Sequence, residues 1–246
     1  MSLLEAVILA GGLGTRLRPV ISDLPKPMAP VGGRPFLEYL MDFWIAEGVG
    51  RFILAVGYKH EAVIGHFGFF YRDIPIDYSI EPELVGTGGG LFLALEKIRG
   101  NDPFFIVNGD TFFPVDVSSA LDFHQRKKSK FTMILREMPS AERYGTVQLR
   151  EDGRIERFSP AGEGNSPYLI NGGVYLADPD FLKKHRRGWD GISPVSSESF
   201  LFPNWADTEE AIFGFRDSGE FIDIGIPEDY KRSQEFFNAF NINPNI

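Results

Sequence analysis

The stretch LAGGLGTRLRPVISDLPKP, residues 9–27, decides the fold of this chain. It continues the apolar run AVIL at residues 6–9, which predicts a buried strand. Glycines, arginines and a lysine then crowd into the loop after that strand, where packing alone requires neither flexible backbone nor positive charge. Because bare backbone N–H groups can approach an anion closely, a glycine-rich loop at the end of a strand indicates a phosphate-binding site.

This loop matches neither of two common phosphate-binding motifs. The dinucleotide fingerprint G-x-G-x-x-G fails because Leu17 stands where the third glycine is needed. The P-loop string G-x-x-x-x-G-K-[ST] is absent from the sequence. The loop instead reads GGLGTRL at residues 11–17, and Lys26 follows between two prolines.

The polar residues of the loop suit a nucleotide. Thr15 offers a hydroxyl, and Arg16 offers a forked cation that matches phosphate oxygens. The prolines on either side of Lys26 stiffen its backbone, so we expect the ammonium group to point in a definite direction. A strand-to-helix turn that needs glycine only for steric reasons is the alternative. Threonine, arginine and lysine together in one loop favour the nucleotide site.

The composition excludes several classes of protein. With 246 residues, 43% of them hydrophobic and 24% charged, we expect one globular domain over residues 1–246. A net charge of −9 without a basic face argues against a nucleic-acid partner. The absence of cysteine excludes disulfides and thiolate chemistry. The N-terminus has no basic region and only a short apolar run, so we expect no membrane partner and a cytoplasmic location.

Apolar runs alternate with helical patterns through the first half of the chain. We expect strands at 6–9, 51–56, 76–80 and 104–107, with helices at 35–47, 59–67 and 89–98. In the second half we expect a hairpin (146–149 and 155–158), strands at 169–176, 211–215 and 220–224, and a helix at 228–240. This order predicts an α/β fold: a Rossmann-like, doubly wound, mostly parallel mixed sheet with helices on both faces and a small β-rich region.

The motifs along the chain resemble those of the sugar-1-phosphate nucleotidyltransferases. LAGGLGTRLRP and LPKPMAPVGGRPFLEY carry the resemblance, and VGTGGGL, VNGDTFF, RYGTV, LINGGVYL and FIDIGIPEDY follow in the family's order. The most similar branch is that of the D-glycero-D-manno-heptose 1-phosphate guanylyltransferases, followed by the mannose-1-phosphate guanylyltransferases. The resemblance implies a mainly nucleotide-binding part at 1–115, a sugar-binding part with the second metal ligand at 116–225, and a C-terminal helix at 226–246.

Two aspartates are candidate metal ligands. Asp110 ends a buried strand, and ligands bind at the carboxyl ends of strands in open α/β sheets. Asp223 interrupts an apolar run, so its buried carboxylate needs a cationic partner, which an arginine could supply. Sequence spacing alone does not show that the two aspartates meet. The resemblance implies that they share one Mg²⁺, an ion that binds carboxylates together with substrate phosphates.

The resemblance assigns the remaining site residues. Arg16 is expected to contact the triphosphate, and Lys26 the α-phosphate or the incoming phosphate. The expected nucleotide-binding residues are Leu9, Ala10, Gly11, Gly12, Gly14, Thr15, Arg16, Glu81, Gly86 and Thr87. The expected sugar-phosphate-binding residues are Asn108, Gly109, Tyr144, Gly145, Asn171 and Gly172, for which a strand-end bulge is the alternative. The sequence also places Thr87 as the N-cap of a helix whose glycines indicate close approach by another group.

One departure from the family concerns the sugar phosphate. The family often carries Glu-Lys after the hairpin, and that lysine meets the sugar phosphate. The matching stretch here, RFSPA at residues 157–161, has no such pair. Arg157 and Glu163 are candidate replacements, and the loops around 163–168 and 189–205 are expected to choose the sugar.

The resemblance implies a nucleotidyl transfer that makes a nucleotide sugar for cell-envelope polysaccharide. An NTP, expected to be GTP, would be attacked at the α-phosphorus by a sugar 1-phosphate, giving GDP-D-glycero-D-manno-heptose or GDP-mannose and pyrophosphate. The acceptor is already an anion, so positioning and charge neutralisation carry the work. A uridylyl or thymidylyl transferase acting on another hexose 1-phosphate, and a non-catalytic regulatory homologue, are the alternatives. We expect a monomer or a homodimer.

Overall fold

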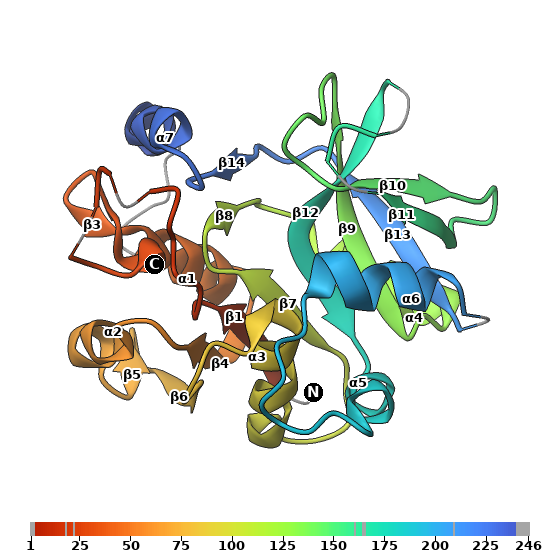
Figure 1. The fold of residues 1–246 in the computed structure, drawn as a ribbon, viewed down its shortest axis with the longest axis horizontal. Coiled ribbons are helices and arrows are strands. Elements are labelled where there is room, and N and C mark those ends of the chain that lie inside the picture. Colours follow the sequence, from red (N-terminus) through yellow and green to blue (C-terminus); the bar gives the residue numbers. More distant parts are fainter. Residues whose placement is uncertain are drawn as a thin grey trace.

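The computed structural model describes residues 3–239 except Arg18, Ser22, Pro160, Gly164, Asn165 and Glu209. Within these residues, ten strands form one mixed sheet with β1 (Leu4–Leu9) near its centre. The strand order is β11-β10-β12-β7-β1-β4-β6-β5, and β9 and β13 continue from β12 off this path. Figure 1 shows helices around this sheet. The predicted fold class is confirmed.

The first half of the chain forms the parallel part of the sheet. β1 pairs in parallel with β4 (Val49–Val56) and with β7 (Phe104–Asn108), and β4 pairs in parallel with β6 (Ile74–Ile80). The connecting helices are α1 (Phe36–Ala46), α2 (His60–Phe67) and α3 (Gly86–Ala94), the last extended by a 3₁₀ turn at Leu95–Lys97. These are the strands and helices that the hydrophobic pattern predicts, with shifted ends.

Alternate residues of β1 face two separate cores, as a sheet covered on both faces requires. Ala6 and Ile8 pack in the core that includes α1, α2, α4 (Val117–Lys127) and α7 (Pro227–Ala239). Val7 packs in the core that includes α3, α5 (Pro179–Arg186) and α6 (Phe202–Ala206). Each fully buried apolar side chain contributes about 1.5–3 kcal/mol, so both faces hold the sheet in place.

The second half adds antiparallel strands to this sheet. β12 (Tyr168–Ala177) is antiparallel to β7 and to β9 (Phe131–Met138), and β13 (Ile212–Asp217) is parallel to β9. The predicted hairpin is confirmed as β10 (Thr146–Leu149) and β11 (Ile155–Ser159), seen at the upper right of Figure 1. β9 was not predicted from the sequence. The β9–β12 register shifts between Asn171 and Val174, so Gly172 and Gly173 sit in a bulge.

Short elements join the two halves. β8 (Thr111–Phe112) pairs with β14 (Ile222–Asp223). Of the strand predicted at 220–224, only these two residues of β14 form a strand. Within the first half, β2 (Pro30–Val31) pairs with β3 (Arg34–Pro35), and a 3₁₀ turn covers Lys26–Met28. The predicted C-terminal helix is confirmed as α7 to Ala239, and Phe240 and the rest of 240–246 lie outside the described residues. Among the described residues, no helix has the length and apolar character needed to span a membrane.

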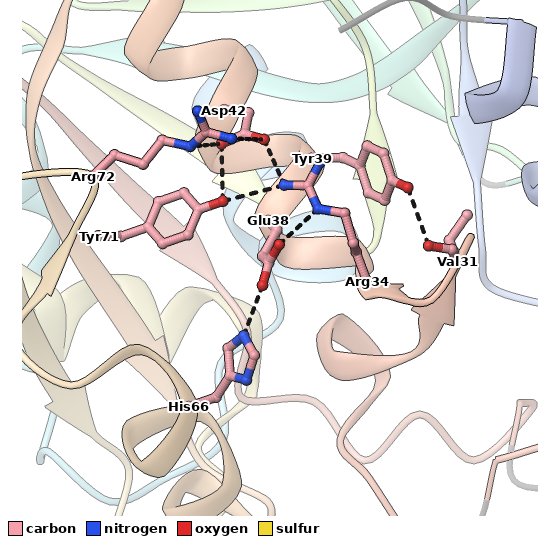
Figure 2. Close-up of polar contacts among 8 residues, drawn as sticks. All are labelled: Val31, Arg34, Glu38, Tyr39, Asp42, His66, Tyr71 and Arg72. Atoms are coloured by element: carbon pink, nitrogen blue, oxygen red, sulfur yellow. Dashed lines mark hydrogen bonds and ion pairs between the residues drawn. The ribbon is translucent and has the colours of Figure 1, made fainter. Parts of the chain in front are cut away.

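A polar network fastens α1 to the segment that contains β5 (Phe70–Tyr71), as Figure 2 shows. The Asp42 side chain is 4% exposed and accepts hydrogen bonds from Arg34 Nη2 (2.6 Å) and from the Tyr71 hydroxyl (2.9 Å). Arg72 Nε lies 2.7 Å from the same carboxylate. A buried carboxylate with this many donors is fully compensated, so the network is a tether between α1 and the edge of the sheet.

Candidate active site

A cavity of about 390 Å³ opens at the carboxyl ends of β1 and β7, between the two halves of the chain. This edge of an open α/β sheet is where ligands bind. The predicted site residues on its wall are Leu9, Ala10, Gly12, Gly14, Thr15, Arg16, Lys26, Thr87, Asn108, Gly109, Asp110, Tyr144, Gly145, Asn171 and Asp223. Gly11, Glu81, Gly86 and Gly172 are not on the wall. The structure therefore gathers most of the predicted residues around one space.

Lys26 lies between the two candidate metal ligands. Its Nζ is 2.5 Å from Asp110 Oδ2 and 3.7 Å from Asp223 Oδ1. The Lys26 side chain is 9% exposed, and the 3₁₀ turn that carries it begins directly after Pro25. The ammonium group therefore has the definite direction that the flanking prolines predict. The cationic partner of Asp223 is this lysine rather than an arginine.

The pairing of β8 with β14 brings the two aspartates together. Asp223 stands opposite Thr111, the residue after Asp110, and Ile224 N donates to the Asp110 carbonyl oxygen at 3.0 Å. Gly225 N also donates to Asp223 Oδ1 at 2.6 Å, which fixes the carboxylate toward the cavity. Residues more than a hundred positions apart thus meet through a ladder of two residues on each strand.

The electrostatics of this cluster are unbalanced, because two carboxylates share one ammonium group. Burial opposes ionisation of Asp110, but the Lys26 charge and hydrogen bond outweigh it and lower the pKa of Asp110. Burial and the nearby Asp110 charge raise the pKa of Asp223. A second cation would relieve the repulsion between the two carboxylates. The cluster therefore has the charge and the oxygen donors that suit a divalent cation.

The donor set fits Mg²⁺ only together with a substrate. Among the described residues, no group of three or more acidic or histidine side chains is placed to hold a metal ion. Two carboxylates can hold Mg²⁺ when phosphate oxygens and water complete its six positions. Asp110 and Asp223 face the cavity where phosphates would lie, so they meet this requirement.

The glycine loop packs closely around its charged neighbours. Gly14 has a φ of +57°, and a Cβ there would lie 3.0 Å from the Lys26 Cβ, so glycine leaves room for the lysine. A Cβ at Gly11 would lie 2.1 Å from Glu81 Oε1. Glu81 therefore stands directly behind the loop, and burial raises its pKa. The predicted nucleotide residues Gly11 and Glu81 contact each other rather than the cavity.

The start of α3 differs from the sequence prediction. Val85, not Thr87, is the N-cap residue, and it makes no side-chain cap. Thr87 Oγ1 instead accepts a hydrogen bond from Ser197 N at 3.0 Å, so the N-cap assignment is wrong. Gly86 has a φ of +76°, and a Cβ there would lie 2.6 Å from the Val195 carbonyl oxygen. The close approach that these glycines permit is made by the protein's own chain at Val195.

The side of the cavity that was expected to bind the sugar contains two residues that were not predicted from the sequence. Asn171 Nδ2 donates to the Tyr175 hydroxyl (2.8 Å) and to Glu198 Oε1 (3.1 Å), and all three residues line the cavity. Burial and the Asp110 charge raise the pKa of Glu198, against the hydrogen bond from Asn171. Glu198 belongs to a π-helical turn (Ser197–Leu201) within the loop at 189–205 that was expected to choose the sugar. Tyr175 carried no signal beyond its place in an apolar strand.

The candidate replacements for the missing lysine do not reach the cavity. Neither Arg157 nor Glu163 is on the cavity wall. Arg157 pairs with Gln148 in the β10–β11 hairpin, and the Glu163 carbonyl oxygen accepts from Thr146 Oγ1 at 2.7 Å. The cation nearest in sequence that does line the cavity is Arg143, which precedes β10.

Comparisons with known proteins cover nearly the whole chain. The model of the nucleotidyl transferase family matches residues 5–238. The D-glycero-alpha-D-manno-heptose 1-phosphate guanylyltransferase of Aneurinibacillus thermoaerophilus is 41% identical, and the match covers 94% of this chain and 97% of that protein. The mannose-1-phosphate guanylyltransferase of Mycobacterium tuberculosis is 34% identical, and the match covers 93% of this chain and 63% of that protein.

A solved structure supports the fold. HddC from Yersinia pseudotuberculosis, complexed with GMP-PN, superposes with a TM-score of 0.82 at 31% sequence identity. The superposition covers 96% of this chain and all of that one (100%). The similarity therefore extends over both halves of the sheet.

Proposed function

The chain belongs to the nucleotidyl transferase family, and from this premise we propose that it transfers a guanylyl group from GTP to a heptose or mannose 1-phosphate. The family expected from the sequence is thereby confirmed, and the chain is a nucleotidyltransferase rather than a non-catalytic homologue. Three relatives support guanine as the base: two are named guanylyltransferases, and one was solved with GMP-PN. The observation that carries the proposal is the Asp110–Lys26–Asp223 cluster beside the glycine loop.

In the proposed reaction, an oxygen of the sugar phosphate forms a bond to the α-phosphorus of GTP. The bond from that phosphorus to the bridging oxygen breaks, and pyrophosphate leaves with the electron pair. Lys26 is placed to contact the α-phosphate or the incoming phosphate, and Arg16 to contact the triphosphate. No side chain needs to remove a proton, because the attacking oxygen is already ionised. Holding the phosphates in line and neutralising them accounts for the rate.

Asp110 and Asp223 are the residues that would hold Mg²⁺ in this proposal. When bound, the ion would supply positive charge to the phosphates of both substrates. Lys26 keeps the two carboxylates close before substrates arrive, since it contacts both. The proposal also retains Gly11, Gly86 and Gly172, each next in sequence to a wall residue, and Glu81, which lies against Gly11, as site residues. A cytoplasmic monomer or homodimer is the form in which we propose that the protein works.

The test is a substrate matrix. The protein is incubated with each of GTP, UTP, dTTP and ATP against D-glycero-α-D-manno-heptose 1-phosphate, mannose 1-phosphate and glucose 1-phosphate, and pyrophosphate release is followed. We expect GTP with heptose or mannose 1-phosphate to turn over at least about 10-fold faster than other pairs, a difference of about 1.4 kcal/mol. Reactions without sugar phosphate are the control. Faster turnover with UTP or dTTP, or no turnover with any pair, would overturn the proposal.

A further inference from the structure

The cavity holds few cations for the charge that its substrates bring. In the described part of the chain, the wall carries only Arg16, Lys26 and Arg143 as cationic side chains. Lys26 already contacts two carboxylates, and Arg16 belongs to the glycine loop. A triphosphate and a sugar phosphate must nevertheless lie close together for the transfer to occur. The sugar phosphate therefore needs a cation of its own, and Arg143 is the one without an assigned role.

Arg143 has hydrogen-bond donors to spare. Its Nη2 donates to Asp229 Oδ2 and, at 2.8 Å, to the Tyr144 hydroxyl. Within the described residues, neither Nε nor Nη1 of Arg143 makes a hydrogen bond, and the side chain is 36% exposed. A guanidinium group has five N–H donors in a fixed fork that fits two oxygens of one phosphate. Both two-donor edges of this fork include Nη2, so the Nε and Nη1 groups of Arg143 can each donate to one anion oxygen while Nη2 keeps its partners.

Neighbouring residues place Arg143 beside the reacting groups. The Tyr144 ring packs edge-on against Phe221 at 5.5 Å, two residues before Asp223. The Gly145 carbonyl oxygen accepts from Asn171 N at 3.1 Å, so the same segment also touches the sugar side of the cavity. Arg143 thus lies where the metal-binding strand and the sugar wall meet.

Asp229 holds the guanidinium group from the other side. Its side chain is 10% exposed and lies in the first turn of α7, also 3.4 Å from Arg232. Because one Asp229 oxygen contacts Nη2 of Arg143, the side chain of Arg143 is fixed before any ligand binds. A fixed cation loses less conformational entropy on binding than a free one.

We propose that Arg143 binds the phosphate of the acceptor sugar 1-phosphate and that Asp229 positions it. This assignment rests on the proposed function. It moves the phosphate-binding cation from β11, where Arg157 was a candidate, to the segment before β10. The acceptor oxygen is then held close to the Lys26 and Asp223 side of the cavity, where the α-phosphate would lie.

The test compares three variants with wild type: Arg143→Met, Asp229→Asn and, as matched control, Arg157→Met. In Arg143→Met we expect the KM for the sugar 1-phosphate to rise about 10- to 100-fold, as loss of a charged hydrogen-bonded contact predicts. The KM for GTP should change less than about threefold. Asp229→Asn breaks the same ion pair but keeps the guanidinium group. The rise in KM for the sugar 1-phosphate should therefore be several-fold smaller than in Arg143→Met. Arg157→Met should match wild type.

A purely structural ion pair predicts a different pattern. It would make Arg143→Met and Asp229→Asn equally harmful and would shift both KM values together, and that result would overturn the assignment. Wild type without turnover would instead overturn the proposed function. Calorimetric titration with mannose 1-phosphate needs no turnover and decides the assignment separately. Wild type that binds at least 10-fold more tightly than Arg143→Met supports it, whereas equal affinity, or no binding by wild type, overturns it.

Discussion

Two clusters of charged side chains in this protein are built in opposite ways. Around Asp42, one carboxylate meets Arg34, Arg72 and the Tyr71 hydroxyl, so cations and donors outnumber it (Figure 2). At the cavity, Asp110 and Asp223 share the single ammonium group of Lys26. The first cluster is closed and lies between α1 and the edge of the sheet. The second is open to a cavity and is short of positive charge.

The difference separates a structural network from a reactive one. A compensated carboxylate gains nothing from another cation, so the Asp42 cluster has no reason to bind a ligand. Two carboxylates with one ammonium group keep an unmet demand for positive charge, and they are stabilised when a metal ion and substrates bind. Carboxylates that lack enough cations and line a cavity therefore indicate the functional site here, whereas the number of ion pairs does not.

The largest expected effect is the loss of activity on changing Asp110 to asparagine. The amide keeps the size of the side chain but removes the charge that would hold a cation beside the phosphates. We expect kcat to fall at least about 100-fold, as for loss of one transition-state charge contact. The free energy of unfolding should stay within about 1 kcal/mol of wild type, because Lys26 keeps Asp223 as a partner. Pyrophosphate release and urea denaturation measure the two quantities.

Near-wild-type turnover of this variant would remove Asp110 from the proposed metal site. A large loss of stability together with activity would show that the cavity cluster is structural, and the contrast with Asp42 would disappear. The matched control is Asp178→Asn. That carboxylate is paired with Lys130 (2.7 Å) far along the sheet, and its change should leave turnover unaltered.

The second prediction reverses this pattern at Asp42. Changing Asp42 to asparagine leaves Arg34 and Arg72 facing a neutral amide in a buried site. Breaking a buried ion pair in this way costs about 3–5 kcal/mol, which urea denaturation will detect as a lower midpoint. Turnover per folded molecule should stay within about twofold of wild type, because the network does not touch the cavity. Lost turnover with unchanged stability would show that the closed cluster also serves catalysis.

The sequence predicted the open cluster better than the closed one. The glycine loop, the proline-bracketed Lys26 and the strand-end Asp110 all carry local patterns. The meeting of Asp110 with Asp223 came only from the family resemblance, because the β8–β14 ladder is too short to leave a periodic signal. The Asp42 network was not predicted at all. Its partners Tyr71 and Arg72 lie about 30 positions away, and nothing in helix periodicity points to them.

Other differences have physical causes of the same kind. Thr87 has the residue type of an N-cap, but Gly86 with its positive φ lets α3 begin earlier and leaves the hydroxyl to bind Ser197. β9 was missed although it begins with the apolar run FTMIL, a local pattern that favours a strand. No role was predicted for Arg143 beyond its place in the RYGTV motif, because its pairing with Asp229 spans 86 positions. Contacts between residues far apart in the sequence decide the cases of Thr87 and Arg143.

The smallest expected effect lies at the rim of the closed cluster, where Glu38 contacts Arg34 Nε and His66 Nε2, each at 2.8 Å. Burial opposes ionisation of Glu38, but the contacts with His66 and Arg34 outweigh it and lower its pKa below 4.5. A carboxylate whose pKa is lower in the folded state than in the unfolded state stabilises the fold at pH values above the unfolded pKa. This contribution is lost as the pH falls through the folded-state pKa.

Glu38→Gln should therefore lower the free energy of unfolding by about 1 kcal/mol or less at pH 7, and the difference from wild type should shrink toward pH 3.5. Glu61→Gln is the control. The Glu61 side chain is 77% exposed, and its ion pair with His60 is longer, at 3.5 Å. Urea denaturation at both pH values gives the comparison. If the Glu38→Gln difference is as large at pH 3.5 as at pH 7, packing rather than charge holds the rim. The contrast between the clusters would then rest on Asp42 alone.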